Sequence, residues 1–164
     1  MDRICLIHWK SREEWDARAA RLRTAQYEVL PVLEFTAFRP LIYRKLGIKE
    51  DSRVGLFDAP PDFEATLGEL PAGARTTRSP DLGCDVTIWF VMTLDELHQG
   101  MAPMAPFAGA GKRFWIAWPK KSSGVRSDLS DAVVRSAGLD AGLVDYKVCS
   151  IDSTWSAYCF AVKK

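Results

Sequence analysis

The alternation of apolar and polar positions predicts a chain in which strands and helices follow one another. Several segments carry apolar side chains at both odd and even positions, which is typical of strands covered on both faces of a parallel sheet. The last two strands are joined by a loop short enough only for an antiparallel hairpin. Beyond residue 50, the predicted strands span residues 53–58, 75–78, 85–92, 113–118, 144–151 and 157–162.

Apolar residues at helical spacing predict helices between these strands. Thr93 and Glu96 form a capping box at the start of one helix. We expect Pro103 and Pro106 to interrupt that helix, because proline lacks an N–H and clashes with the preceding turn. The residues expected on its inner side are Leu94, Leu97, His98 and Met101.

Three shorter helical segments are predicted elsewhere. One begins near Pro40 and ends at Gly47, and a second covers residues 62–67. Asp128 is expected to cap the third, which runs to Ala137 and is closed by Gly138.

The first part of the chain predicts a strand–helix–strand unit. Residues 3–8 and 27–33 have the pattern of short strands, and a helix is expected to begin at Ser11 between them. Pro31 places the second strand at a sheet edge. The fold class is therefore α/β: a three-layer Rossmann-like sandwich with a mostly parallel sheet and an antiparallel C-terminal strand. We expect one domain over residues 1–164, in which residues 1–34 form an N-terminal βαβ extension.

Composition narrows the function classes. The chain has 164 residues, of which 48% are hydrophobic and 26% charged, as expected of a globular domain rather than a disordered chain. Its 22 Lys and Arg residues nearly balance 21 Asp and Glu residues, which argues against a strongly basic nucleic-acid binder. No apolar run approaches the roughly 18 residues that cross a bilayer, and no secretory signal is evident. We expect a cytoplasmic protein without membrane attachment.

Cysteine and histidine give no catalytic or metal-binding pattern. The four cysteines are scattered singly, so we expect buried reduced thiols, no metal site and no predicted cofactor. His8 and His98 have no acid or nucleophile at a recognisable spacing, and no Gly-x-Ser-x-Gly elbow is present. The catalytic residues, if there are any, are unknown.

Ligands of open α/β sheets bind outside the carboxyl ends of the strands, which directs attention to three loops. The first, residues 58–63, begins with Asp58 and contains Pro60 and Pro61 where a nucleotide-binding fold would place glycines. Prolines remove two N–H donors, so this loop cannot cradle a phosphate at those positions. Asp58 is kept as a candidate ligand-binding residue.

The second loop, residues 119–127, joins a strand to a helix and combines cations, hydroxyls and a glycine. It could hold a phosphate or carboxylate, although a solvated loop is naturally rich in the same residues. In the third loop, residues 152–156, Trp155 is either a lid over a ligand or a residue that fills the core. The candidate ligand-binding residues of these two loops are Lys120, Lys121, Ser122, Ser123, Arg126 and Trp155.

Five segments beyond residue 40 resemble an uncharacterised bacterial family known as domain of unknown function 3052. The matching segments are residues 45–49, 58–60, 63–68, 118–124 and 141–145. The resemblance brings no established activity or site residue. Residues 1–34 are similar to the opening of a response-regulator receiver domain.

The order of elements after Arg53 is more distantly similar to the S-adenosylmethionine-dependent methyltransferase fold, including a reversed last strand. That resemblance implies a glycine-rich cofactor loop and an acidic residue after the second strand. The sequence instead has Ala59, Pro60 and Pro61 in the loop, and the strand over residues 75–78 ends without the acid.

Three functions are consistent with these patterns. The first is a non-catalytic module that binds a small anionic ligand or a protein partner. The second is a divergent S-adenosylmethionine-dependent methyltransferase or nucleotide-binding enzyme. The third is a structural role, in which the N-terminal unit adds strands to the sheet or exchanges with a second copy in a homo-oligomer.

Overall fold

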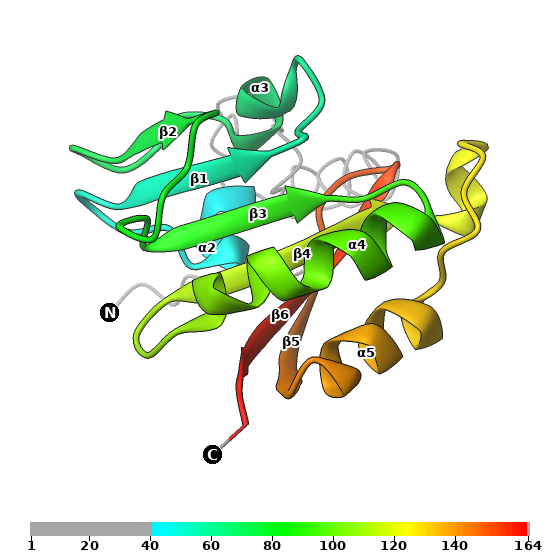
Figure 1. Ribbon diagram of the computed structural model, residues 1–164. Helices are drawn as coiled ribbons and strands as arrows, with labels where there is room; N and C mark the ends of the chain where they lie inside the picture. Colours follow the sequence, from blue (N-terminus) through cyan, green and yellow to red (C-terminus); the bar gives the residue numbers. More distant parts are fainter. Residues whose placement is uncertain (1–40, 164) are drawn as a thin grey trace, which may run out of the picture. The chain divides into compact units, whose positions relative to one another are not determined.

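The computed structural model describes residues 41–163 (Figure 1). The expectations for residues 1–34, including the βαβ extension and the edge position of Pro31, lie outside the described residues. Contacts along the chain divide it between Arg39 and Pro40. The described helices are α2 (Ile42–Leu46), α3 (Phe63–Leu67), α4 (Leu94–Met104), α5 (Asp131–Asp140) and the 3-10 turns η1 (Ala105–Ala108) and η2 (Lys121–Ser123). The strands are β1 (Arg53–Phe57), β2 (Arg75–Thr77), β3 (Val86–Phe90), β4 (Arg113–Pro119), β5 (Leu143–Ser150) and β6 (Trp155–Val162).

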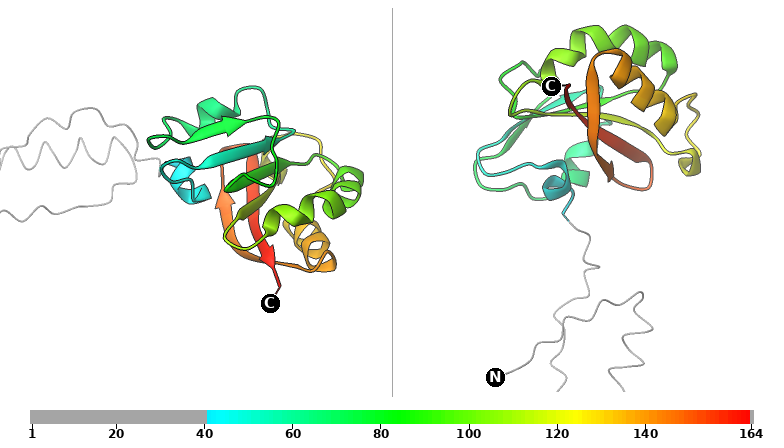
Figure 2. Two further views of the ribbon diagram at one scale, coloured as in Figure 1. Left: turned by 60° about the vertical axis from the view of Figure 1, so that its left-hand side comes forward. Right: turned by 90° about the horizontal axis from the view of Figure 1, so that it is seen from below.

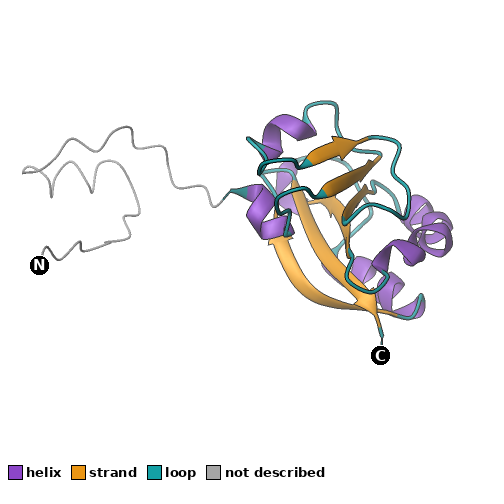
Figure 3. Ribbon diagram, turned by 90° about the vertical axis from the view of Figure 1, so that its left-hand side faces the viewer, coloured by secondary structure: helices purple, strands orange, loops and turns teal. Residues whose placement is uncertain are grey.

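Six strands form a single mixed sheet in the order β2-β1-β3-β4-β6-β5. The first four strands in this order pair in parallel. The last strand of the chain, β6, runs antiparallel to both of its neighbours and lies between β4 and β5. Figure 3 shows the two long strands β5 and β6 side by side. The predicted mostly parallel sheet with an antiparallel C-terminal strand is confirmed.

Helices cover both faces of this sheet. In the right-hand view of Figure 2, α4 and α5 lie on one side of the sheet, and α2 and α3 lie on the other. Val86, Ile88 and Phe90 point into the core on the α2–α3 side, whereas Trp89 and Val91 belong to the core on the α4–α5 side. This alternation is the one that the pattern of β3 predicts. A full three-layer sandwich remains an expectation, because α2 and α3 have only five residues each.

The residues that cap the starts of α5 and α4 are not all those that the sequence predicts. The residue that caps α5 is Ser130, whose side chain accepts the N–H of Val133, and Gly138 lies inside the helix. Asp128 instead accepts the backbone N–H of Leu94 at 2.8 Å, at the start of α4. The sequence could not separate these two capping residues, because Asp128 is engaged by a segment 34 residues away.

Pro103 does not interrupt α4, contrary to expectation, whereas the α-helix does end at Met104, two residues before Pro106. Pro103 lies within the last turn of the helix, so only one helical hydrogen bond is lost there. Pro106 comes at the start of η1, where a missing N–H costs little. The capping box of Thr93 and Glu96 is confirmed, whereas His98 is exposed rather than on the inner side.

Three cysteines, Cys84, Cys149 and Cys159, are buried free thiols, as expected, and Cys5 lies outside the described residues. None of the described helices combines the length and the apolar character needed to cross a membrane.

Candidate functional site

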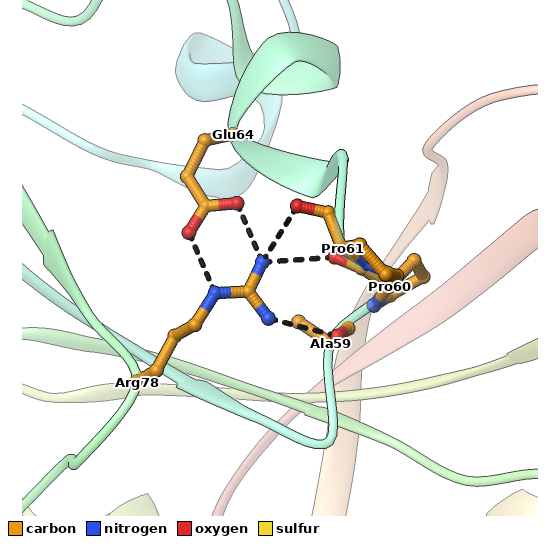
Figure 4. Close-up of polar contacts among 5 residues, drawn as sticks. All are labelled: Ala59, Pro60, Pro61, Glu64 and Arg78. Carbon is orange, nitrogen blue, oxygen red and sulfur yellow. Dashed lines mark hydrogen bonds and ion pairs between the residues drawn. The ribbon is translucent and has the colours of Figure 1, made fainter.

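The loop after β1 is held by a single arginine. The guanidinium of Arg78 donates to the carbonyl oxygens of Ala59 at 3.0 Å, Pro60 at 2.9 Å and Pro61 at 3.1 Å (Figure 4). It also binds both carboxylate oxygens of Glu64, at 2.9 and 2.6 Å. Three successive peptide carbonyls and one carboxylate therefore surround one cation supplied by the chain itself.

Local sequence explains why this loop accepts hydrogen bonds rather than donating them. Pro60 and Pro61 have no N–H, so the loop can offer mainly carbonyl oxygens. Glu64 lies in the first turn of α3, just after the loop, which brings its carboxylate to the same guanidinium. The hydrogen bond from Arg78 lowers the pKa of the Glu64 carboxyl, and the same contact raises the pKa of Arg78. The carbonyl oxygens of residues 59–61 and the Glu64 carboxylate thus form a site for a cation, and the guanidinium of Arg78 occupies it.

The topological switch point of the sheet lies between β1 and β3. From the central strand β1, the chain places β2 on one side and β3 on the other. The connections that follow β1 and β3 lead to helices on opposite faces of the sheet, α3 and α4, and ligands of open α/β sheets usually bind at such a switch point.

A cleft of about 530 Å³ lies at this switch point. Its walls come from the ends of β1 and β3 and from one side of α4. The lining residues are Phe57, Asp58, Trp89, Phe90, Met92, Glu96, Gln99, Gly100, Pro103 and Met104. Its size falls within the roughly 300–1,000 Å³ typical of small-molecule sites.

The polar wall of the cleft is acidic. Asp58 is exposed and has a positive φ of 52°, and within the described residues no hydrogen bond or ion pair engages its carboxylate. Glu96 accepts the backbone N–H groups of Met92 at 2.8 Å and Thr93 at 3.2 Å through one oxygen, Oε2. Gln99 adds an exposed amide, and no Lys, Arg or His of residues 41–163 lines the cleft.

The apolar floor of the cleft depends on a close contact between a tryptophan and a helical glycine. A Cβ atom added to Gly100 would lie 2.2 Å from Cζ2 of Trp89, so the indole ring occupies the space that any other residue would need. Trp89 also stacks on Phe114, with ring centroids 6.4 Å apart. Glycine in the middle of α4 is unfavourable for the helix, and the position of Trp89 explains its presence.

The basic loop places its first lysine against the C-terminal hairpin. The ammonium of Lys120 donates to the Ser150 hydroxyl at 2.7 Å and, at a shorter distance, to the carbonyl of Asp152. Ser123 donates to the carbonyl of Lys120 at 2.7 Å and accepts from the N–H of Val125. Lys120 and Ser123 therefore hold the loop itself.

The remaining candidates lie apart from one another. Lys121, Ser122 and Arg126 are exposed on the loop after β4, whereas Asp58 is at the end of β1. Trp155 is buried in the core on the α2–α3 side, where its ring meets Phe90 edge to face at 4.9 Å. Of the seven predicted site residues, only Asp58 lines the switch-point cleft.

Sequence reasoning did not identify Arg78, Glu64, Trp89, Gln99 or Gly100. One signal was available for Gly100, since a glycine between helix formers often marks a close approach by another group. Among the described residues, no group of three or more His, Cys, Asp or Glu side chains is placed to hold a metal ion.

No protein-family model matches the chain, and no curated protein matches it. The resemblance to domain of unknown function 3052 and the receiver-like opening therefore remain predictions.

Solved structures to which the chain is similar include LepI in complex with SAM, at 16% identity and a TM-score of 0.44, covering 90% of this chain and 52% of that chain. A structure described as a pericyclic reaction enzyme is 14% identical with a TM-score of 0.43, covering 94% of this chain and 55% of that one. Sp1610 of Streptococcus pneumoniae, described as a candidate tRNA methyltransferase in complex with S-adenosyl-L-methionine, is 12% identical with a TM-score of 0.35, covering 70% and 57%. The chain spans little more than half the length of these proteins, and similarity at this level assigns no activity.

Proposed function

We propose that the protein is a non-catalytic α/β module that binds a small organic ligand in the cleft at the carboxyl ends of β1 and β3. The observation that carries this proposal is the cleft itself. It combines about 530 Å³ of space, an apolar floor around Trp89 and an exposed carboxylate at Asp58, at the switch point of the sheet.

Two features favour binding without catalysis. Among the described residues that line the cleft there is no Ser, Cys, His or Lys, so these residues offer no hydroxyl or thiol nucleophile and no imidazole or amine for proton transfer. The neighbouring loop over residues 59–61 directs its carbonyl oxygens to Arg78. A cofactor that needs backbone N–H donors from this loop would find acceptors there instead.

Ligand-observed screening followed by amide mapping tests the proposal. We expect compounds from a library of small organic molecules to shift the Gly100 amide and the Trp89 indole N–H signals in two-dimensional NMR spectra of the full chain. The Gly111 amide, in the turn before β4, serves as the internal control. A library that shifts no cleft signal, or shifts only signals elsewhere, would contradict the proposal.

A divergent S-adenosylmethionine-dependent methyltransferase is the second candidate. The insertion of the reversed last strand β6 between β4 and β5 supports it, since the resemblance to that fold includes a reversed last strand. Calorimetric titration with S-adenosylmethionine distinguishes the two. Saturable micromolar binding, together with methyl transfer to any acceptor, would favour the enzyme over the non-catalytic module.

A further inference from the structure

We infer that the ligand of the switch-point cleft is an organic cation, a protonated or quaternary amine attached to an aromatic or aliphatic body. The inference rests on the proposed function, since it names the class of ligand for the same cleft. It departs from the anionic ligand that the basic loop over residues 119–127 suggests.

Charge is the first reason. Within the part of the chain that the structure describes, the ionisable residues of the lining are Asp58 and Glu96, both acidic. The second oxygen of Glu96, Oε1, accepts no hydrogen bond within the described residues, and neither does the Asp58 carboxylate. An anion entering the cleft would meet two carboxylates and, among the described lining residues, no compensating cation, whereas an ammonium would find a partner at Asp58.

The backbone donors beside the cleft give the second reason. The start of α4 would ordinarily attract an anion, because its first N–H groups have no partner within the helix. Here the chain's own side chains accept two of these N–H groups, those of Leu94 and Glu96, and two more that lie just before the helix. Glu96 takes the N–H groups of Met92 and Thr93, Asp128 takes that of Leu94, and Thr93 takes that of Glu96. An anionic ligand would have to displace these acceptors.

The apolar walls give the third reason. Phe57, Trp89 and Met92 line the cleft together with the two acids. Aromatic rings attract alkylated ammonium groups through their π faces, and the strength of this contact increases when the cation is partly desolvated. Trp89 can reach the floor of the cleft only because Gly100 has no side chain. A cleft lined by aromatic side chains and exposed carboxylates favours a hydrophobic cation over a neutral or anionic molecule of the same shape.

Three compounds that share one phenyl body and differ in charge test the inference: phenethylammonium, phenethyl alcohol and 3-phenylpropionate. Each is titrated into the full chain at pH 7 and low salt, and the shifts of the Gly100 amide and the Trp89 indole N–H are fitted to a dissociation constant. We expect phenethylammonium to bind at least about tenfold more tightly than the alcohol, with no measurable binding of the propionate. Added salt should reduce this preference.

Asp58→Asn is the decisive variant, because asparagine tolerates the positive φ of this position and removes only the charge. We expect it to lower the affinity for phenethylammonium to about that for the alcohol. Asp62→Asn is the matched control: it is an exposed carboxylate on the same loop, it does not line the cleft, and its side chain makes no capping hydrogen bond. This control should keep the preference for the cation.

The outcomes separate this inference from the proposed function. Equal binding of the alcohol and the amine in the cleft would overturn the cationic ligand while leaving the cleft as a binding site. Tighter binding of the propionate would overturn it as well. If none of the three compounds binds, the inference fails, and the library screen alone then decides whether the cleft is a ligand site.

Discussion

Arg78 and Glu64 form a bidentate ion pair in which guanidinium nitrogens lie 2.9 and 2.6 Å from the carboxylate oxygens. The side chains are 44% and 40% exposed, so solvent screens much of the attraction. The pair nevertheless lowers the pKa of Glu64, and its stabilising effect must therefore depend on pH.

We expect Glu64→Gln to lower the free energy of unfolding at pH 7. A carboxyl whose pKa is lower in the folded state stabilises the fold above its ordinary value of 4.5 and loses this contribution as the pH falls through the folded value. The stability gap between the wild type and the variant should therefore narrow below about pH 4.5 in urea unfolding experiments. Glu69→Gln, at an exposed position, is the control. A gap that stays constant down to pH 3 would show that the pair contributes nothing through ionisation.

Gly138 and Phe160 make a second close contact, between α5 and β6. A Cβ atom at Gly138 would lie 2.1 Å from Cε1 of the fully buried Phe160 ring. Ala is the better helix former by about 1 kcal/mol, but crowding of a packed core typically costs about 1–3 kcal/mol. We expect Gly138→Ala to be destabilising by about 1–2 kcal/mol in chemical denaturation.

A double variant shows whether the ring is the cause. Gly138→Ala combined with Phe160→Leu should cost less than the sum of the two single changes, because the smaller side chain leaves room for the new methyl group. Ser136→Ala, at an exposed position of the same helix, should change stability by no more than about 0.5 kcal/mol. Strict additivity of the two core substitutions would refute the steric explanation.

Two adjacent lysines are expected to behave differently. Lys120 holds the Ser150 hydroxyl and the Asp152 carbonyl of the β5–β6 hairpin, whereas Lys121 is exposed. Lys120→Met should lower stability by about 1–2 kcal/mol and increase amide exchange around Asp152, since it removes charge-assisted hydrogen bonds. Lys121→Met should leave both quantities unchanged. Equal effects of the two substitutions on stability and amide exchange would mean that the Lys120 hydrogen bonds do not stabilise the hairpin.

Burial raises the pKa of the Cys149 and Cys159 thiols, so little thiolate is present in the folded protein near neutral pH. We expect both thiols to resist alkylation at pH 7.5 and to react rapidly once urea unfolds the protein. Peptide mass spectrometry after timed labelling measures each cysteine separately. Modification of Cys149 in the native protein at the rate of a free thiol would contradict this placement.

Strands that are apolar on both faces were predictable from the sequence, because each buries successive side chains in two different cores. In β3, Ile88 and Trp89 enter opposite cores as the pattern indicates. A capping residue could be predicted from the sequence only where its side chain binds an N–H of the helix that directly follows it. Thr93 caps the helix that follows it, whereas Asp128 binds a distant N–H and leaves Ser130 to cap α5.

The candidate site was predictable only in part. Asp58, which lines the cleft, was selected as a candidate from its position after a strand, since the rule for open sheets depends on topology alone. The role of Arg78 could not be predicted from the sequence. Its acceptors are backbone carbonyls of another loop, and every residue type has such a carbonyl. Lys120 was a candidate ligand-binding residue because a lysine in a loop suggests anion binding. The structure shows that its ammonium instead donates to Ser150 of the hairpin, a contact that the sequence does not indicate.

The placement of β6 between β4 and β5 has a consequence for biosynthesis. At roughly 5–20 residues per second, a ribosome completes β4 several seconds before it completes the strand that must pair with it. During this interval, the hydrophobic edge of β4 around Trp115 and Ile116 is open to other nascent chains. Pairing of this edge of β4 must therefore await β6, and a chain that stops before Trp155 would leave the edge without its partner strand.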